Sequence, residues 1–375
     1  MSVPAFASTS RVMLIAPHPD DEALACSVLL QHAVHAGSAV RVVYATDGED
    51  NPWPQRVALR KWRLDATDRK RWAKLRRAEA LAALRVLRVN GSSARFLALP
   101  DQKLTTLLIC DCRSIVQRLA GIIIDWAPTD LFVPSISDTH PDHSALAVML
   151  RLTLSEFFSD DDRMFVWGYA VHGRSPAFFD RAQTVRQSAI EAAAKLRAIR
   201  CHKTQLRLSK KRFLGYAARP ERFLKLAVRE QASSDGPIAS ILRQQYSLRI
   251  KLQFSPKVIR TTKSALLILG CSNHRALRCA RLQLPAYSSQ VEMFDCATRR
   301  RFHVGRYRGN AFAGELTIPI DIFSPVHALF VKLARRSWLF DEAGWLEIPG
   351  ESSQLIAAPN VDLVERFDLP FVMHA

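Results

Sequence analysis

Two short segments of the chain concentrate histidine and aspartate, the residues best suited to bind a metal ion and to move protons. The first is Ala16–Glu22 (APHPDDE), and the second is Ser137–His143 (SDTHPDH). Proline holds the residue before it in an extended conformation, so each segment is expected to be a stiff loop. A single loop of this kind is more often a turn or a helix cap. Two such loops, each following a predicted strand, favour a catalytic metal site.

A hydrolytic metal site typically has three protein ligands drawn from His and Asp or Glu, with a fourth position open for water. His18, Asp21 and His143 would supply two imidazoles and one carboxylate. This donor set suits Zn²⁺, with Fe²⁺ or Co²⁺ as alternatives, and we expect one ion per chain. Neither segment contains cysteine, which argues against a closed structural zinc site.

The other polar residues of the two segments remain available for proton transfer. Asp20 could take a proton from a metal-bound water and so act as the general base. His140, when protonated, could stabilise the oxyanion and supply a proton to the leaving nitrogen. Asp142 could hold an imidazole in the required tautomer. We therefore predict Asp20, His140 and Asp142 as the catalytic residues.

The elements that must position these residues alternate between strands and helices over the first two-thirds of the chain. Apolar periodicity predicts strands at 11–16, 39–46, 95–99, 130–134 and 164–171. It predicts helices at 23–36, 70–89, 105–126 and 143–158, with a polar insertion at 47–69. This alternation indicates an α/β fold, a Rossmann-like and mostly parallel sheet with helices on both faces. Ligands of such sheets bind outside the carboxyl ends of the strands, where both segments fall.

The pattern changes after residue 229. Residues 231–240 (QASSDGPIAS) have the composition of a linker, and the strands that follow show period-two alternation. We therefore predict two domains, a catalytic domain at 1–232 and an all-β, sandwich-like domain at 242–375. None of the predicted catalytic residues lies in the second domain. We expect it to be dispensable for the chemistry and to help place a large or membrane-associated substrate.

The APHPDDE run after the first strand, with the later His140–His143 (HPDH), resembles the PIG-L/LmbE family of zinc-dependent de-N-acetylases. The similarity extends from Val12 to about Arg229, and the C-terminal β domain departs from compact members of the family. The family hydrolyses N-acetyl groups, most often on N-acetylglucosamine carried by a lipid, a thiol conjugate or another small scaffold. The resemblance implies the same metal ligands, the same base and the same protonated histidine as the residues themselves suggest.

The expected function is thus a zinc-dependent N-deacetylase of an N-acetylhexosamine in a glycolipid, a polysaccharide precursor or another small glycoconjugate. One alternative keeps the site but makes the enzyme an amidase of a thiol conjugate or other acyl-amide. An alternative of another class is a basic binding protein for nucleic acid or glycan with a vestigial metal site. That reading requires a missing ligand or base, and all are present.

Charge and hydropathy add expectations about partners and location. The net charge is +18, with twelve Lys or Arg against three acids at 56–88, and twelve against one at 195–229. These stretches would attract phosphates, so an anionic or lipid-linked substrate and peripheral membrane contact are compatible with the sequence, while no stable nucleic-acid partner is expected. The apolar run after Arg11 is too short for a secretory signal, and we expect a cytoplasmic protein. The oligomeric state is left open.

Three further residues are candidates for substrate binding. Trp53 lies in the polar insertion and could offer an aromatic platform for a sugar ring. His172 ends a predicted strand at the catalytic edge of the sheet. Arg77, on a basic helix, could bind a substrate phosphate, although a solvated helix face is the common alternative.

Overall fold

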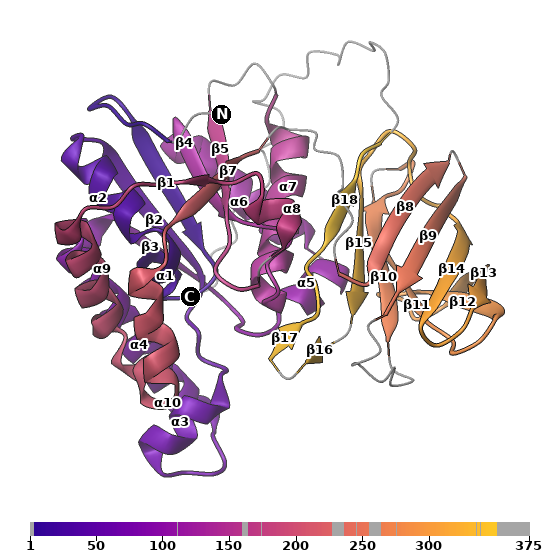
Figure 1. Ribbon diagram of the computed structural model, residues 1–375, viewed down its shortest axis with the longest axis horizontal. Coiled ribbons are helices and arrows are strands. Elements are labelled where there is room, and N and C mark those ends of the chain that lie inside the picture. The colour runs from indigo at the N-terminus through magenta and orange to yellow at the C-terminus, as the bar shows by residue number, and fades with distance from the viewer. Residues whose placement is uncertain are drawn as a thin grey trace, which may run out of the picture.

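The computed structural model describes residues 4–110, 112–159, 164–173, 175–226, 236–244, 246–254, 264–274, 276–334, 336–337 and 339–350. Part of the predicted linker, 231–235, and the end of the predicted β domain, 351–375, lie outside these residues. The described chain forms an α/β part followed by an antiparallel β part, as expected (Figure 1).

A seven-stranded sheet forms the centre of the N-terminal part. Its strands are β1 (Arg11–Ala16), β2 (Ala39–Thr46), β3 (Ala94–Leu99), β4 (Asp130–Pro134), β5 (Phe165–Tyr169), β6 (Gln183–Thr184) and β7 (Arg222–Lys225), in the order β3-β2-β1-β4-β5-β7-β6. The pairs among β1 to β5 are parallel, and β7 runs antiparallel to β5 and β6. The predicted mostly parallel sheet is confirmed. The strand order reverses between β1 and β4, so these two strands flank the switch point.

Helices cover both faces of this sheet. They are α1 (Asp21–Ala25), α2 (Ser27–His35), α3 (Pro52–Leu59), α4 (Ala66–Val86), α5 (Leu104–Cys110), α6 (Arg113–Trp126), α7 (Pro141–Phe157), α8 (Pro176–Phe179), α9 (Ala189–Cys201) and α10 (Lys203–Leu214). Apolar residues of α1, α2, α4 and α9 pack in one core cluster with the sheet, and those of α5, α6 and α7 pack in another. Among the described residues, no helix is both long enough and apolar enough to cross a membrane.

The structure differs from the predicted helices in three places. The helix expected at 23–36 is broken at Cys26, because the Glu221 carboxylate accepts hydrogen bonds from the first amides of α2, those of Val28 and Leu29. The helix expected at 105–126 is divided into α5 and α6. The insertion at 47–69 contains α3 and the beginning of α4, which starts at a capping box formed by Asp65 and Asp68. At the starts of α2 and α4, a capping carboxylate rather than apolar periodicity determines the helix boundary.

Nine described strands of the C-terminal part form one antiparallel sheet. They are β8 (Ile238–Gln244), β9 (Ser247–Gln253), β10 (Ala265–Cys271), β11 (Leu277–Gln283), β12 (Ser289–Asp295), β13 (Arg301–Gly309), β14 (Ala313–Pro319), β15 (Leu329–Ala334) and β18 (Leu346–Ile348). Alternate residues of these strands share one core cluster, as period-two patterning predicts. The all-β prediction is confirmed, with one continuous nine-stranded sheet and a separate two-stranded hairpin in the described residues, in place of the two packed sheets of a sandwich. Strand β8 also includes 238–240, the end of the predicted linker.

The two parts are joined by a common core. Leu267 and Leu269 of β10, Phe330 of β15 and the buried Trp345 belong to the same apolar cluster as helices α5, α6 and α7. A buried ion pair crosses the same boundary, with Arg151 Nε 2.8 Å from the Glu347 carboxylate. Figure 1 shows the β sheet beside these helices, with the hairpin of β16 (Arg336–Ser337) and β17 (Phe340–Asp341) on the side of the N-terminal part.

Candidate active site

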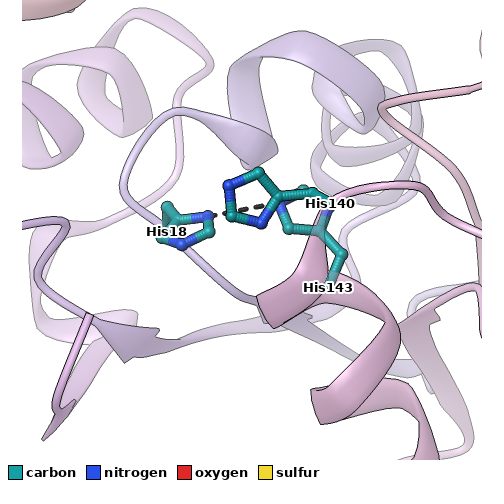
Figure 2. A group of neighbouring side chains, drawn as sticks. All are labelled: His18, His140 and His143. Carbon is teal, nitrogen blue, oxygen red and sulfur yellow. Dashed lines mark hydrogen bonds between the residues drawn. The ribbon is translucent and has the colours of Figure 1, made fainter. Parts of the chain in front are cut away.

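The two His- and Asp-rich segments meet at the carboxyl edge of the sheet. The first follows β1 and leads into α1, and the second follows β4 and leads into α7. Because β1 and β4 are paired in parallel, both loops leave the sheet side by side. In Figure 2 the ring of His18, from the loop after β1, converges with those of His140 and His143, from the start of α7. The predicted juxtaposition of the two segments is therefore present.

The three predicted metal ligands bring one atom each to a common point. The distance from His18 Nδ1 to His143 Nε2 is 3.1 Å. The distance from Asp21 Oδ2 to His18 Nδ1 is 3.5 Å, and to His143 Nε2 it is 3.4 Å. Ligands at about 2.0–2.1 Å from a tetrahedral ion are separated by about 3.4 Å. All three side chains are buried. The triangle thus has the dimensions of three corners of a tetrahedral site.

Carboxylates hold the other nitrogen of each imidazole. Asp101 Oδ1 lies 3.2 Å from His18 Nε2, and Asp138 Oδ2 lies 3.1 Å from His143 Nδ1. Since a carboxylate only accepts, each of these nitrogens carries the proton, which leaves the lone pairs of His18 Nδ1 and His143 Nε2 directed at each other and at Asp21. The His18 backbone amide donates to Asp21 Oδ2 at 2.9 Å, and the remaining converging lone pairs fit a cation.

The pKa values of the triangle reflect this need for positive charge. Burial alone would lower the pKa of His18, but Asp101, Asp142 and Asp21 raise it well above its usual value. Burial would also lower the pKa of His143, but Asp21 and Asp138 outweigh this effect and raise it. Burial would raise the pKa of Asp21, yet the adjacent imidazoles hold it well below the usual range. The site favours an anionic Asp21 with a cation beside it.

Asp20 is buried next to this triangle but has a different partner. Its Oδ2 accepts a hydrogen bond of 3.0 Å from Arg76 Nη2, and Arg76 also donates to the carbonyl oxygens of Pro19 and Gly48. Burial raises the pKa of Asp20 to about 6, against the opposing effect of Arg76. The backbone of Asp20 has φ 145°, a strained conformation for a residue with a side chain. The fold therefore fixes this carboxylate in place without using it in the triangle.

The environment of His140 differs from the prediction. Burial and the neighbouring His143 and His18 lower the pKa of His140 well below its usual value, so a protonated ring is disfavoured. The backbone amide of Asp142 donates to His140 Nδ1 at 3.3 Å. A neutral ring that accepts at Nδ1 carries its proton on Nε2. His140 can therefore donate a hydrogen bond from Nε2 as a neutral imidazole, while its protonated state stays a prediction.

Asp142 lies at the site but supports it through other residues than expected. Its carboxylate accepts hydrogen bonds from the backbone amides of Gln102 at 2.6 Å and Leu104 at 3.1 Å, at the start of α5. Its Oδ2 also lies 3.5 Å from His18 Nε2. The imidazole that Asp142 approaches is that of His18, and its predicted role in holding a tautomer stays a prediction.

A cavity of about 450 Å³ opens over the triangle. Its walls include Trp53 and His172, two of the three residues predicted to bind substrate. Burial lowers the pKa of His172 to about 3, so this ring is neutral. Arg76 also lines the cavity, whereas Arg77 does not: its guanidinium pairs with the Asp47 carboxylate at 2.5 Å. The structure does not bring Arg77 to the site, because successive residues of α4 point to different sides of the helix.

Several residues around the site were not among the predicted ones. Asp138 stands inside the second motif, so its place beside a histidine was a usable signal. Glu22 is the last residue of the first motif and lies 2.8 Å from the buried His202, whereas Asp101 lies outside both motifs, shortly after β3. The cavity is further lined by α10 residues such as Arg212, and by Leu339 and Phe340 of the β part. No sequence motif indicated these two residues of the β part, whose predicted dispensability for the chemistry stays a prediction.

Comparisons with known proteins agree with the motif analysis. Residues 13–153 match the profile of the PIG-L family, described as GlcNAc-PI de-N-acetylase. The 1D-myo-inositol 2-acetamido-2-deoxy-alpha-D-glucopyranoside deacetylase of Mycobacterium avium is 31% identical over 150 residues, which are 36% of this chain and 49% of that protein. The match thus spans about half the length of this curated relative.

Two solved structures are similar to the chain at lower identity. One is N,N'-diacetylchitobiose deacetylase from Pyrococcus horikoshii, with 20% identity, a TM-score of 0.46, and coverage of 58% of this chain and 84% of that one. The other is a conserved protein from Thermus thermophilus, with 21% identity, a TM-score of 0.44, and coverage of 59% and 97%. Superpositions of this quality support no conclusion about activity.

Proposed function

From the match of residues 13–153 to the PIG-L family profile, we propose that the chain is a metal-dependent N-deacetylase of that family. Its substrate class is an N-acetylhexosamine of the N-acetylglucosamine type, in a glycolipid, a polysaccharide precursor or another small glycoconjugate. The observation that carries the proposal is the buried triangle of His18 Nδ1, Asp21 Oδ2 and His143 Nε2. The name of the mycobacterial relative, which describes a 2-acetamido sugar joined to inositol, supports the substrate class.

We propose His18, Asp21 and His143 as the ligands of one Zn²⁺ per chain, with Fe²⁺ or Co²⁺ as alternatives. Two imidazoles and a carboxylate are a donor set typical of catalytic zinc, which keeps a further position for water. Such an ion would act as a Lewis acid and lower the pKa of a water molecule at the site. Asp101 and Asp138 would orient the two imidazoles by holding their second nitrogens.

The residues of the chain itself account for the proton transfers. Asp20 accepts a proton from the attacking water as the water oxygen bonds to the acetyl carbon, while Arg76 holds the Asp20 carboxylate in position. His140 donates from Nε2 to the oxygen that was the amide carbonyl and stabilises its developing negative charge. Asp20 then returns the proton to the nitrogen as the carbon–nitrogen bond breaks. The products are acetate and a free amine.

The cavity over the site has room for one sugar ring with its substituent. Trp53 lies on its wall with 39% of its side chain exposed, the arrangement expected of an aromatic surface for a sugar. His172, neutral and turned toward the same cavity, is proposed to contact the substrate. The cytoplasm remains the proposed location.

Acetate release from defined substrates tests the proposal. The purified full-length chain is incubated with N-acetylglucosamine, N,N'-diacetylchitobiose and an N-acetylglucosaminyl inositol, with and without a chelator, and acetate and bound metal are measured. We expect about one divalent ion per chain, and acetate release that stops on chelation and returns with Zn²⁺.

The matched variants are His143→Ala and His303→Ala. His303 lies on β13 and pairs with Asp321, remote from the triangle, so His303→Ala should keep both metal and activity. His143→Ala should lose both. Full metal occupancy in His143→Ala would contradict the ligand set. Release of other acyl groups, with none of acetate, would favour the amidase alternative.

A further inference from the structure

The β part contributes residues to the active-site cavity. Leu339 and Phe340, in the hairpin β16–β17, line the same cavity as His18, Asp20 and Asp21. About 200 residues of chain separate Phe340 from His140, yet the two ring centroids are 5.7 Å apart, with their planes at 78°. The hairpin therefore reaches the centre of the site rather than its outer rim.

Two contacts attach this hairpin to the loop that supplies His140 and His143. The backbone amide of Asp341 donates to the carbonyl of Thr139 at 2.8 Å. The Asp341 carboxylate lies 2.6 Å from Lys332 Nζ, which in turn donates to Ser144 Oγ at 3.1 Å. Thr139 and Ser144 stand directly on either side of the 140–143 motif. The position of the hairpin is thus tied to the catalytic loop through buried groups.

The Phe340 ring is held between the catalytic histidines and a cation. Its centroid is 5.0 Å from that of His172, and the Arg212 guanidinium lies 4.9 Å from the Phe340 centroid. The side chain remains partly exposed, and it borders a second cavity of about 330 Å³ as well as the catalytic one. A molecule whose amide reaches His140 can therefore contact the Phe340 ring.

We propose that the β domain completes the substrate site, with Phe340 as the residue that positions the sugar. This inference rests on the proposed deacetylase function. Phe340 packs against the apolar face of the N-acetylated sugar and holds the acetamido group toward His140. The ring makes no bond to the reacting atoms, so it acts in substrate binding and not in proton transfer.

Kinetics of full-length variants test the role of Phe340. We compare Phe340→Ala, the conservative Phe340→Tyr, and Phe294→Ala, which removes a partly exposed ring from β12, a strand without a residue in the cavity. For N-acetylglucosamine and N,N'-diacetylchitobiose we expect Phe340→Ala to raise KM about tenfold, with kcat within about threefold. Phe340→Tyr and Phe294→Ala should keep the wild-type KM. Metal content and melting temperature are measured for each variant, and Phe340→Leu replaces Phe340→Ala if the latter does not fold.

Calorimetric binding of N-acetylglucosamine to the same proteins separates this inference from the proposed function. If the wild type binds the sugar but releases no acetate, the deacetylase proposal fails, and weaker binding by Phe340→Ala still supports the positioning role. If a folded, metal-loaded Phe340→Ala binds and turns over the sugar like the wild type, the inference is overturned. If the wild type neither binds nor turns over any sugar, both proposals are overturned.

Discussion

Asp20 and Asp21 are adjacent in the sequence, yet their surroundings shift the pKa values of the two carboxylates in opposite directions. Burial raises the pKa of Asp20 to about 6. Burial acts on Asp21 in the same direction, but the nearby His143 and His18 hold its pKa well below the usual range. The side chain of Asp21 faces two imidazoles, whereas that of Asp20 faces Arg76. This difference in surroundings is what distinguishes the proposed metal ligand, Asp21, from the proposed base, Asp20.

Asp20→Asn is expected to keep the metal and lose turnover. The amide cannot accept a proton, so kcat should fall by roughly 10²–10⁴, the usual contribution of a general base. Steady-state kinetics and metal analysis of the purified variant check this. Asp47→Asn is the control, because Asp47 is also buried and paired with an arginine but does not line the cavity. Near-normal turnover of Asp20→Asn would move the role of base to another residue.

Asp138→Asn is expected to weaken metal binding without removing a ligand. Asp138 accepts from His143 and also from the backbone amides of His140, Val171 and His172, so it orders both the imidazole and the loops around it. Loss of such a partner typically lowers metal affinity 10–100-fold. Competition with a fluorescent zinc chelator measures the change. Asp130→Asn, a buried carboxylate on β4 bonded to Trp167, should bind zinc like the wild type.

Among the elements, the short helix α2 depends on a buried ion pair between Lys195 of α9 and Glu221, the residue before β7. Lys195 Nζ lies 3.0 Å from the Glu221 carboxylate, which caps α2 through the amides of Val28 and Leu29. Lys195→Met would leave that carboxylate buried without its cation. We expect the free energy of unfolding to fall by about 3 kcal/mol in urea denaturation.

The matched control is an exposed pair on the β sheet. Arg301 and Glu292 are 2.6 Å apart with more than half of the Arg301 side chain exposed, so Arg301→Met should change stability by less than about 1 kcal/mol. Equal effects of the two substitutions would show that the Glu221 cap does not need Lys195.

Whether the sequence predicts an element boundary depends on how far apart in the chain the interacting residues lie. Apolar periodicity predicted β1, β2, β4 and the helices around them, because it reports which face each element buries. It missed the break at Cys26, since the cap at that point comes from Glu221, almost 200 residues away. The proposed metal ligands could be named from the sequence because their residue types stand in two compact motifs. Phe340 was missed because nothing in the sequence around an aromatic residue of a β hairpin indicates that it lines a cavity.

At the scale of the whole molecule, the shared core predicts that the two parts unfold together. Trp345 is fully buried in the cluster that includes α5, α6 and α7, and its amide donates to the Ile136 carbonyl at 2.7 Å. Trp345→Ala should cost about 3–5 kcal/mol and lower the melting temperature of the whole chain in one transition. Trp62→Ala, at a 71% exposed position, should leave it unchanged. A separate, unshifted transition in differential scanning calorimetry would show that the parts are energetically independent.

The same shared core determines which surfaces of the N-terminal part are free to meet another molecule. Helices α5 and α7 face the β part of the same chain, and α7 is joined to it by Arg151–Glu347 and Ser144–Lys332, whereas α6 keeps exposed residues such as Ile124. A second copy of the protein cannot use the covered side of α7, so any self-association must form through other surfaces, such as those of α6, α2, α9 or the β sheet. Chemical crosslinks between copies should accordingly map to those surfaces and be absent from the buried residues 141–150 of α7. The apolar side chains of α7, which would favour association if they were exposed, are thus buried within one polypeptide.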